Sequence, residues 1–256
     1  MCLIIASQAG ERPSEDLLTQ AAIDNPDGWG LVWYDGKRLR IRKGLDTFHA
    51  LSAMDEIPEG RPYVLHFRWS THGRNTLDNC HPFKLGDWGY MAHNGVLAIP
   101  TSRNRGMSDT WHFAQYWVKP YLKQQNPTDD ELLDMAEDFI GHSNETLLGR
   151  EMQSKLAFLK ADGKILIANE TQGQWEDGIW YSNTFSHEEV LWAKMKPHKQ
   201  EYQELVPDLF LPNGLNCDSC GQYSENFWFR YDSYICEDCY QESLLQWKCD
   251  GKTVRS

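Results

Sequence analysis

Two closely spaced pairs of cysteines near the C-terminal end restrict the fold of this chain more than any other feature. Cys217 and Cys220 form one C-x2-C pair, fifteen residues follow, and Cys236 and Cys239 form the second. Such spacing lets two turns supply four thiolates tetrahedrally to zinc. A segment of ~40 residues has too small a core to fold alone, so the metal would supply most of its folding free energy. The pattern predicts a zinc-ribbon-like module over residues 214–256; unpaired thiols or reducible disulfides are the alternative.

A site with four cysteine ligands leaves no open coordination position, so the predicted zinc is structural rather than catalytic. Residues 214–256 contain seven acidic and four basic side chains, a balance that disfavours nucleic-acid binding. Docking to a partner protein through Phe227–Phe229 is the preferred interpretation. Cys249 lies outside the spacing and is predicted to take no part.

The residues before this module predict one large domain. A stretch rich in Pro, Asn and Gly at 207–214 separates residues 1–206 from the cysteine-rich segment. The net charge of −12 disfavours binding to nucleic acid or an anionic membrane. No run approaches the ~20 apolar residues of a membrane span, and no basic leader precedes the first apolar run. Together with an odd number of cysteines, seven, these features indicate a cytoplasmic protein.

The large domain is predicted to have an α+β fold, because helical and strand patterns both occur along it. The strand patterns cover residues 2–7, 29–34, 38–42, 62–69, 88–93, 155–160, 164–169 and 178–182. The helical patterns cover 14–22, 46–56, 108–118 and 128–140, with Ser14 and Ser108 as expected N-caps.

Cys2 is a candidate nucleophile because of its position. An ordinary thiol, with a pKa of about 8.5, is only slightly ionised at neutral pH and needs a base. Removal of Met1 would give Cys2 a free α-amine with a pKa of roughly 7.7 to 8.0, so that nucleophile and base share one residue. Only the first position of a mature chain allows this. The alternative is an ordinary buried thiol.

Other residues supply what a thiol nucleophile and an amino-acid substrate would need. Asn94 and Gly95 end a predicted strand and suit an oxyanion hole, although Asn-Gly is also a common turn. Arg68 suits a carboxylate because its planar guanidinium donates two parallel hydrogen bonds. Asp109 could bind an ammonium group, or serve only its helix terminus.

These residues fall within a series of motifs that resembles the class II glutamine amidotransferases, which are N-terminal-nucleophile hydrolases. The resemblance is close over roughly the first 120 residues. It rests on Met1-Cys2, NPDGWG at 25–30, HFRWSTHG at 66–73, NCHPF at 79–83, AHNG at 92–95 and SDT at 108–110.

The resemblance implies a four-layer αββα sandwich and a role for each motif residue. Cys2 would be the nucleophile, and Asn94 with the Gly95 N–H would form the oxyanion hole. Arg68 would bind the carboxylate of L-glutamine and Asp109 its α-amine, while Trp69, Thr71 and His72 shape the pocket. Glutamine would acylate Cys2, release ammonia and leave as glutamate.

Two departures from the family pattern qualify this hypothesis. A small cysteine-rich segment stands where related synthases carry a large ammonia-consuming domain, so we expect ammonia to be delivered to a separate acceptor enzyme. Cys80 stands where many relatives have a small residue, and is predicted to be a buried space-filler. The alternatives are an N-terminal-nucleophile amidohydrolase that acts on another amide, and a noncatalytic interaction module.

Overall fold

The computed structural model describes residues 2–70, 73–99, 101, 103–146, 154–184 and 186, with 215–216, 222–224, 227–230 and 233–236. The chain divides after Met195 into two compact units, which are described separately. The predicted linker at 207–214 lies outside the described residues, so the predicted domain limits, 1–206 and 214–256, remain a prediction.

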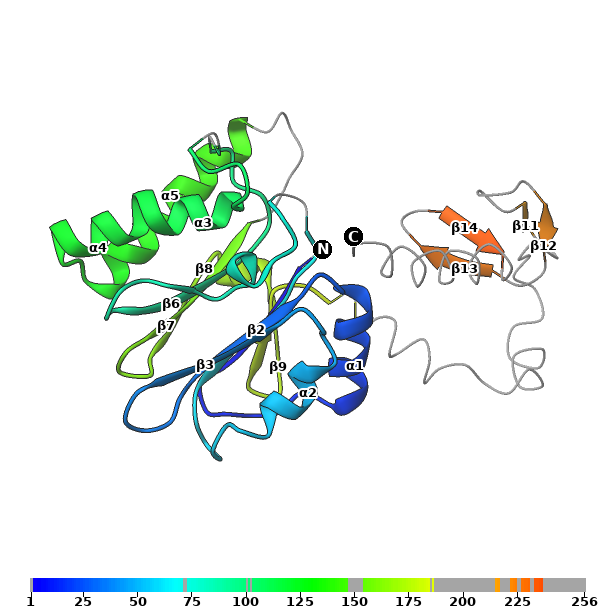
Figure 1. The fold of residues 1–256 in the computed structure, drawn as a ribbon, viewed down its shortest axis with the longest axis horizontal. Coiled ribbons are helices and arrows are strands. Elements are labelled where there is room, and N and C mark those ends of the chain that lie inside the picture. The colour runs from blue at the N-terminus through cyan, green and yellow to red at the C-terminus, as the bar shows by residue number, and fades with distance from the viewer. Residues whose placement is uncertain are drawn as a thin grey trace, which may run out of the picture. The chain divides into compact units, whose positions relative to one another are not determined.

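The first unit contains two antiparallel sheets that carry most of the predicted strands (Figure 1). Sheet A has the order β3-β2-β4-β1-β10-β9 and sheet B the order β5-β6-β7-β8. In sheet A the strands are β1 (Leu3–Ser7), β2 (Trp29–Tyr34), β3 (Leu39–Gly44), β4 (Tyr63–Phe67), β9 (Gln174–Glu176) and β10 (Ile179–Tyr181). In sheet B they are β5 (Phe83–Lys84), β6 (Gly89–Asn94), β7 (Lys155–Lys160) and β8 (Ile165–Ala168).

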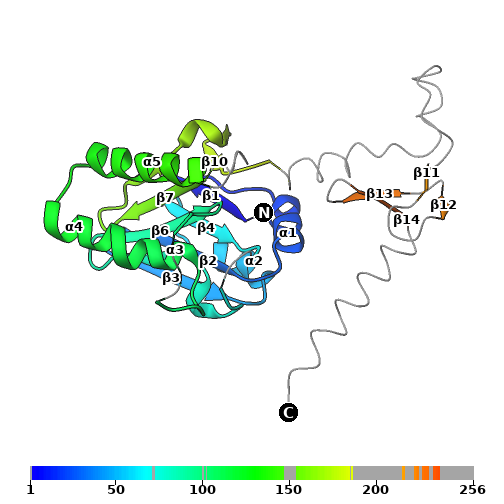
Figure 2. The same cartoon turned by 90° about the horizontal axis from the view of Figure 1, so that it is seen from above.

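Side-chain alternation along the strands builds three apolar layers. In β1, Leu3 and Ile5 pack against α1 (Glu15–Asp24) and α2 (His49–Met54). Ile4 and Ala6 point the other way and join Ala92 of β6 in the core between the two sheets. On the far face of sheet B, Met91 packs against the remaining helices. Because successive residues of a strand face opposite sides, one short strand serves two cores. The α+β fold and the four-layer order are confirmed (Figures 1 and 2).

The helices over sheet B continue further than predicted. Ser108 caps α3 (Asp109–Phe113) by accepting a hydrogen bond from the Trp111 N–H at 3.1 Å. A π-helical segment, η2 (Ala114–Val118), and α4 (Lys119–Gln125) follow without a break. Pro120 is the second residue of α4, so the helical segment continues past Val118. Among the described residues of this unit, the structure also contains α5 (Asp129–Thr146) and the short 3-10 turns η1 (Leu77–Asn79) and η3 (Glu170–Gln172).

The described part of the second unit consists of two short hairpins. β11 (Leu215–Asn216) pairs with β12 (Tyr223–Ser224), and β13 (Phe227–Arg230) pairs with β14 (Ser233–Cys236). Cys236 is the last residue of β14, whereas Cys217, Cys220 and Cys239 lie outside the described residues. Within the described parts of the whole chain, no group of three or more potential ligands suits a metal ion. No described helix is both long and apolar enough to cross a membrane.

Candidate active site

Cys2 directly precedes β1, next to the end of β4. Leu3 is opposite Phe67, so the register places Cys2 opposite Arg68. The Trp69 N–H donates to Cys2 Sγ at 3.2 Å, and the thiol donates to the Trp69 carbonyl at the same distance. Burial raises the pKa of the Cys2 thiol, while the Trp69 hydrogen bond and the Arg68 charge act in the opposite direction. The thiol is therefore protonated at neutral pH and needs a base.

Strand periodicity brings Cys2 and Asn94 to the same side of the sandwich. Cys2 is two residues from Ile4 and Asn94 is two residues from Ala92, and both Ile4 and Ala92 face the core between the sheets. The Ser182 hydroxyl accepts hydrogen bonds from the Ile4 N–H and from Asn94 Nδ2, each at 2.8 Å. One hydroxyl thus links the strand of the predicted nucleophile to the predicted oxyanion donor.

Gly95 follows Asn94 in a backbone conformation that favours glycine. Its φ is +138°, and a Cβ at this position would lie 2.2 Å from Ser154 Oγ. The Ser154 hydroxyl in turn donates to the Val96 carbonyl at 3.1 Å. A side chain at residue 95 would force this segment to move, so glycine keeps the Gly95 N–H at the end of β6.

Arg68 is buried, and neighbouring loop residues hold its guanidinium. Nη1 donates to Asn75 Oδ1 at 3.0 Å and Nη2 donates to Ser70 Oγ at 2.9 Å. Asp27 supports both partners, because its carboxylate accepts from the Ser70 N–H at 2.7 Å and from Asn75 Nδ2 at 3.3 Å. The NPDGWG loop, which contains Asp27, therefore orients the loop that follows Arg68.

Asp109 connects helix α3 to the segment after Gly95. One carboxylate oxygen accepts from the Leu97 N–H at 2.7 Å, and the other accepts from the Thr110 N–H at 2.7 Å and the Thr110 hydroxyl at 3.3 Å. The Thr110 hydroxyl also bonds His93 Nδ1 at 2.8 Å. Asp109 is thus tied to the residues on both sides of Asn94. Of the remaining predicted site residues, Thr71 and His72 lie outside the described residues.

Comparison with known proteins adds an independent line of evidence. The model of the family "Glutamine amidotransferases class-II" matches residues 17–170. The chain belongs to the class II glutamine amidotransferases. Among curated relatives, the putative glutamine amidotransferase YafJ of Escherichia coli is 28% identical over 156 residues, covering 56% of this chain and 59% of that protein. Glutamine–fructose-6-phosphate aminotransferase of Zymomonas mobilis is 36% identical over 120 residues, covering 44% of this chain and 19% of that protein.

The chain therefore spans less than two thirds of either relative. Among solved structures, a glutamine aminotransferase class-II domain protein from Silicibacter pomeroyi aligns with a TM-score of 0.40 at 15% identity, covering 71% of this chain and 87% of that one. A predicted glutamine amidotransferase from Pseudomonas aeruginosa aligns with a TM-score of 0.36 at 18% identity, covering 70% and 78%.

Five residues of this amidotransferase domain that contact the predicted site were not among the sequence predictions. Ser182 and Asn183 follow β10, and Asn183 Nδ2 donates to the Cys2 carbonyl at 2.8 Å. Polar residues directly after a buried strand were the available signal. The others, Asp27, Ser70 and Asn75, lie inside or next to the quoted motifs.

Cys80 is fully buried in the amidotransferase domain. Its Sγ lies 3.7 Å from the Gly44 carbonyl and 3.6 Å from that of Thr76, and a Cβ on Gly28 would lie 2.6 Å from it. Burial raises the pKa of the Cys80 thiol, which disfavours the reactive thiolate. These contacts fit the space-filling role.

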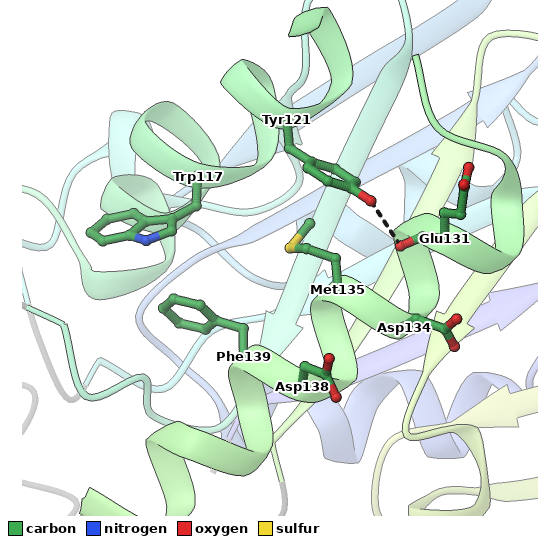
Figure 3. A pocket seen from close by; sticks show the side chains of 7 residues that line it. All are labelled: Trp117, Tyr121, Glu131, Asp134, Met135, Asp138 and Phe139. Atoms are coloured by element: carbon green, nitrogen blue, oxygen red, sulfur yellow. Dashed lines mark hydrogen bonds between the residues drawn. The ribbon is translucent and has the colours of Figure 1, made fainter. Parts of the chain in front are cut away.

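A groove of about 670 Å³ lies on the helical layer that covers sheet B. Figure 3 shows that it runs between the η2–α4 segment and α5, where the Tyr121 hydroxyl donates to the Glu131 carbonyl at 3.3 Å. None of the predicted site residues lines it. Its lining residues are Trp117, Tyr121, Glu131, Asp134, Met135, Asp138 and Phe139.

Proposed function

We propose that this protein hydrolyses L-glutamine to glutamate through a thioester on Cys2 and delivers the ammonia to a separate acceptor enzyme. The observation that carries the proposal is the Ser182 hydroxyl, which bonds both the Ile4 N–H and Asn94 Nδ2. It fixes the strand of the nucleophile relative to the amide that would stabilise an oxyanion.

The proposed reaction begins once Met1 has been removed. The free α-amine of Cys2 accepts the thiol proton while Sγ attacks the side-chain amide carbon of glutamine. Asn94 Nδ2 and the Gly95 N–H donate to the oxyanion of the tetrahedral intermediate. The C–N bond breaks, the ammonium returns its proton to the departing nitrogen, and ammonia leaves. Water then attacks the thioester, which releases glutamate and regenerates the Cys2 thiol.

The proposed substrate is a free α-amino acid because two buried charges of opposite sign lie near Cys2. Arg68 and Asp109 both contribute to the electrostatic surroundings of the Cys2 thiol, and they are only 3% and 6% exposed. Arg68 would bind the glutamine carboxylate and Asp109 the α-ammonium group. A substrate without those groups would form neither of these two charge-assisted contacts. Thr71, His72 and Trp69 would complete the pocket.

Removing the oxyanion donor tests the mechanism. Asn94→Ala is expected to lower kcat for glutamate release by about 10²- to 10³-fold, because one preorganised donor is lost. Ser182→Ala keeps the donor and loses its anchor, so we expect a loss of only about tenfold. Steady-state assays of glutamate release measure both.

Ser186→Ala is the matched control for Ser182→Ala. Ser186 is also buried, and its hydroxyl donates to Asp24 Oδ2 at 2.7 Å rather than to a predicted site residue. Its kcat should stay within about twofold of wild type. An Asn94→Ala variant that retained full kcat would exclude the proposed oxyanion hole.

We also propose that Cys217, Cys220, Cys236 and Cys239 bind one structural zinc ion, on the basis of their spacing. Elemental analysis of the purified protein should find about one zinc per chain. Cys236→Ser should lose the zinc, whereas Cys249→Ser, the matched control outside the spacing, should keep it. Equal zinc content in both variants would contradict the proposed ligand set.

The acceptor enzyme is proposed to dock on the zinc module. Affinity capture with the wild-type chain should retain an ammonia-consuming enzyme, and Cys236→Ser should release it while Cys249→Ser retains it. Retention by all three proteins would show that the interaction does not depend on the zinc module.

A further inference from the structure

His93, the residue before Asn94, is opposite Leu156 of β7 on one side but has no strand partner on the side of β5. β5 contains only Phe83 and Lys84, with Phe83 opposite Met91, and the Leu85 N–H donates to the Gly89 carbonyl at 2.8 Å. Hydrogen-bonded pairs alternate along an antiparallel ladder. Because Leu85 and Gly89 form such a pair, the next positions for one are residues 83 and 91 and then His81 and His93.

The main chain of residue 81 does not make that pair. The His81 carbonyl, which would accept from the His93 N–H in such a pair, instead lies against Gly30 of β2, where a Cβ would be 1.9 Å from the carbonyl oxygen. The ladder between β5 and β6 therefore ends before His93, and the backbone N–H and C=O of His93 need other partners.

Two imidazole rings take the place of the missing strand. His81 Nδ1 accepts from the His93 N–H at 3.3 Å, and His66 Nε2 donates to the His93 carbonyl at 3.2 Å. The two rings lie 4.1 Å apart between their centroids. His66 belongs to β4 of sheet A, so its bond joins the two sheets directly before Asn94 and Gly95.

These bonds fix the protonation of both rings. A carbonyl only accepts, so His66 must carry its proton on Nε2, and an N–H only donates, so His81 must leave Nδ1 bare. Burial lowers the pKa of both imidazoles, which keeps them neutral. Among the described residues His66 Nδ1 has no hydrogen-bond partner. An unsatisfied buried polar atom lowers the stability of the fold, and an apolar side chain would avoid this loss. The histidine is thus explained by its Nε2 bond.

We propose that His66 and His81 are positioning residues that hold the end of β6, and through it the oxyanion donors Asn94 and Gly95, in the geometry for glutamine hydrolysis. The inference rests on the proposed function. Neither imidazole needs to touch the substrate; each acts through the backbone of His93.

Paired substitutions separate this role from a general contribution to folding. His66→Leu and His81→Leu remove the bonds, whereas His66→Gln offers an amide donor near the Nε2 position and His81→Asn an amide oxygen near the Nδ1 position. The leucine variants are expected to lose about 10- to 100-fold in kcat, with KM within about twofold of wild type. The Gln and Asn variants should recover most of that loss.

Alkylation of Cys2 by iodoacetamide, quantified on the N-terminal peptide, provides the second readout because this displacement needs the thiolate but no oxyanion hole. Its rate should stay within about twofold of wild type in all four variants. Leucine variants with wild-type kcat, or with equal losses in kcat and alkylation, would overturn the proposal.

Nitrogen-15 NMR of the wild-type imidazoles tests the same inference without any activity measurement. It should find His66 protonated on Nε2 and His81 unprotonated on Nδ1. A proton on His81 Nδ1 would overturn the positioning role even if glutamine is hydrolysed. Absence of glutaminase activity together with the expected tautomers would instead refute the proposed function.

Discussion

Cys2→Ala is expected to lower glutamate release from glutamine by at least about 10⁴-fold, because the proposed reaction has no other nucleophile. KM for any residual activity should change little, since Arg68 and Asp109 remain. Release of glutamate from purified protein measures the effect, and mass spectrometry of the N-terminus establishes that Met1 has been removed. A Cys2→Ala variant as active as wild type would refute the thioester mechanism.

Cys80→Ala is the matched control, because Cys80 is the other cysteine described in the first unit and is fully buried. It should keep kcat within about threefold and lose about 1 kcal/mol or more of unfolding free energy through the small cavity. A loss of activity equal to that of Cys2→Ala would contradict the assignment of the nucleophile to Cys2 alone.

An alanine inserted between Met1 and Cys2 separates the thiol from the proposed base. The Cys2 nitrogen then becomes an amide, which cannot accept the thiol proton. Activity should fall about as far as in Cys2→Ala while the thiol still reacts with iodoacetamide at alkaline pH. An active insertion variant would show that the base is another group.

Acidification from pH 7 to pH 5 is expected to destabilise the first unit by several kcal/mol. Burial lowers the pKa of His66 to about 3 and that of His93 to about 4, and places that of His81 well below its ordinary value. In the unfolded chain each titrates near pH 6.5. Below pH 6.5 the unfolded state therefore binds protons that the folded state does not, and stability falls as the pH falls.

The expected size follows from the linkage relation. At pH 5 His66 and His93 each cost about 2 kcal/mol, His81 adds a loss of the same sign, and the loss continues until the folded pKa values are reached. Urea unfolding between pH 7.5 and pH 5 measures it. His81→Asn should flatten the pH dependence, because it removes one of the three buried histidines.

His49→Asn is the control for this measurement, since the His49 side chain is 72% exposed and lies on the surface at the start of α2. It should leave the pH dependence unchanged. A stability that does not change between pH 7 and pH 5 would mean that the three buried histidines are not kept neutral.

Most helices and strands of the first unit could be predicted, because caps and side-chain alternation are local sequence patterns. Ser14 caps α1 as predicted, accepting from the Leu17 N–H, and the hairpin of β2 and β3 follows the predicted alternation. β5 and β9 were missed, because strands of two and three residues have no detectable period. The helix predicted to end at Val118 continues to Gln125, since its packing on sheet B outweighs the weak stop signal of Pro120.

The sequence alone predicted Cys2, Arg68, Asn94 and Asp109 as site residues, because each belongs to a short motif and its chemistry depends on residue type. It also determined which strand residues share a face, since the period of a strand is two. The sequence did not predict the register between strands that are distant along the chain. The pairing of β1 with β10 brings Ser182 to Ile4 across 178 residues of chain, and the packing of sheet A on sheet B brings it to Asn94 across 88.

The histidine contacts have the same origin. His66, His81 and His93 occur in three separate motifs, and nothing local relates the imidazole of one to the backbone of another. The sheets pack face to face, the ladder of β5 stops at Phe83, and the two rings then replace its missing bonds. The sequence determined which groups are present, and the tertiary structure decided which of them meet, because hydrogen bonds between distant segments depend on sheet packing and register rather than on local pattern.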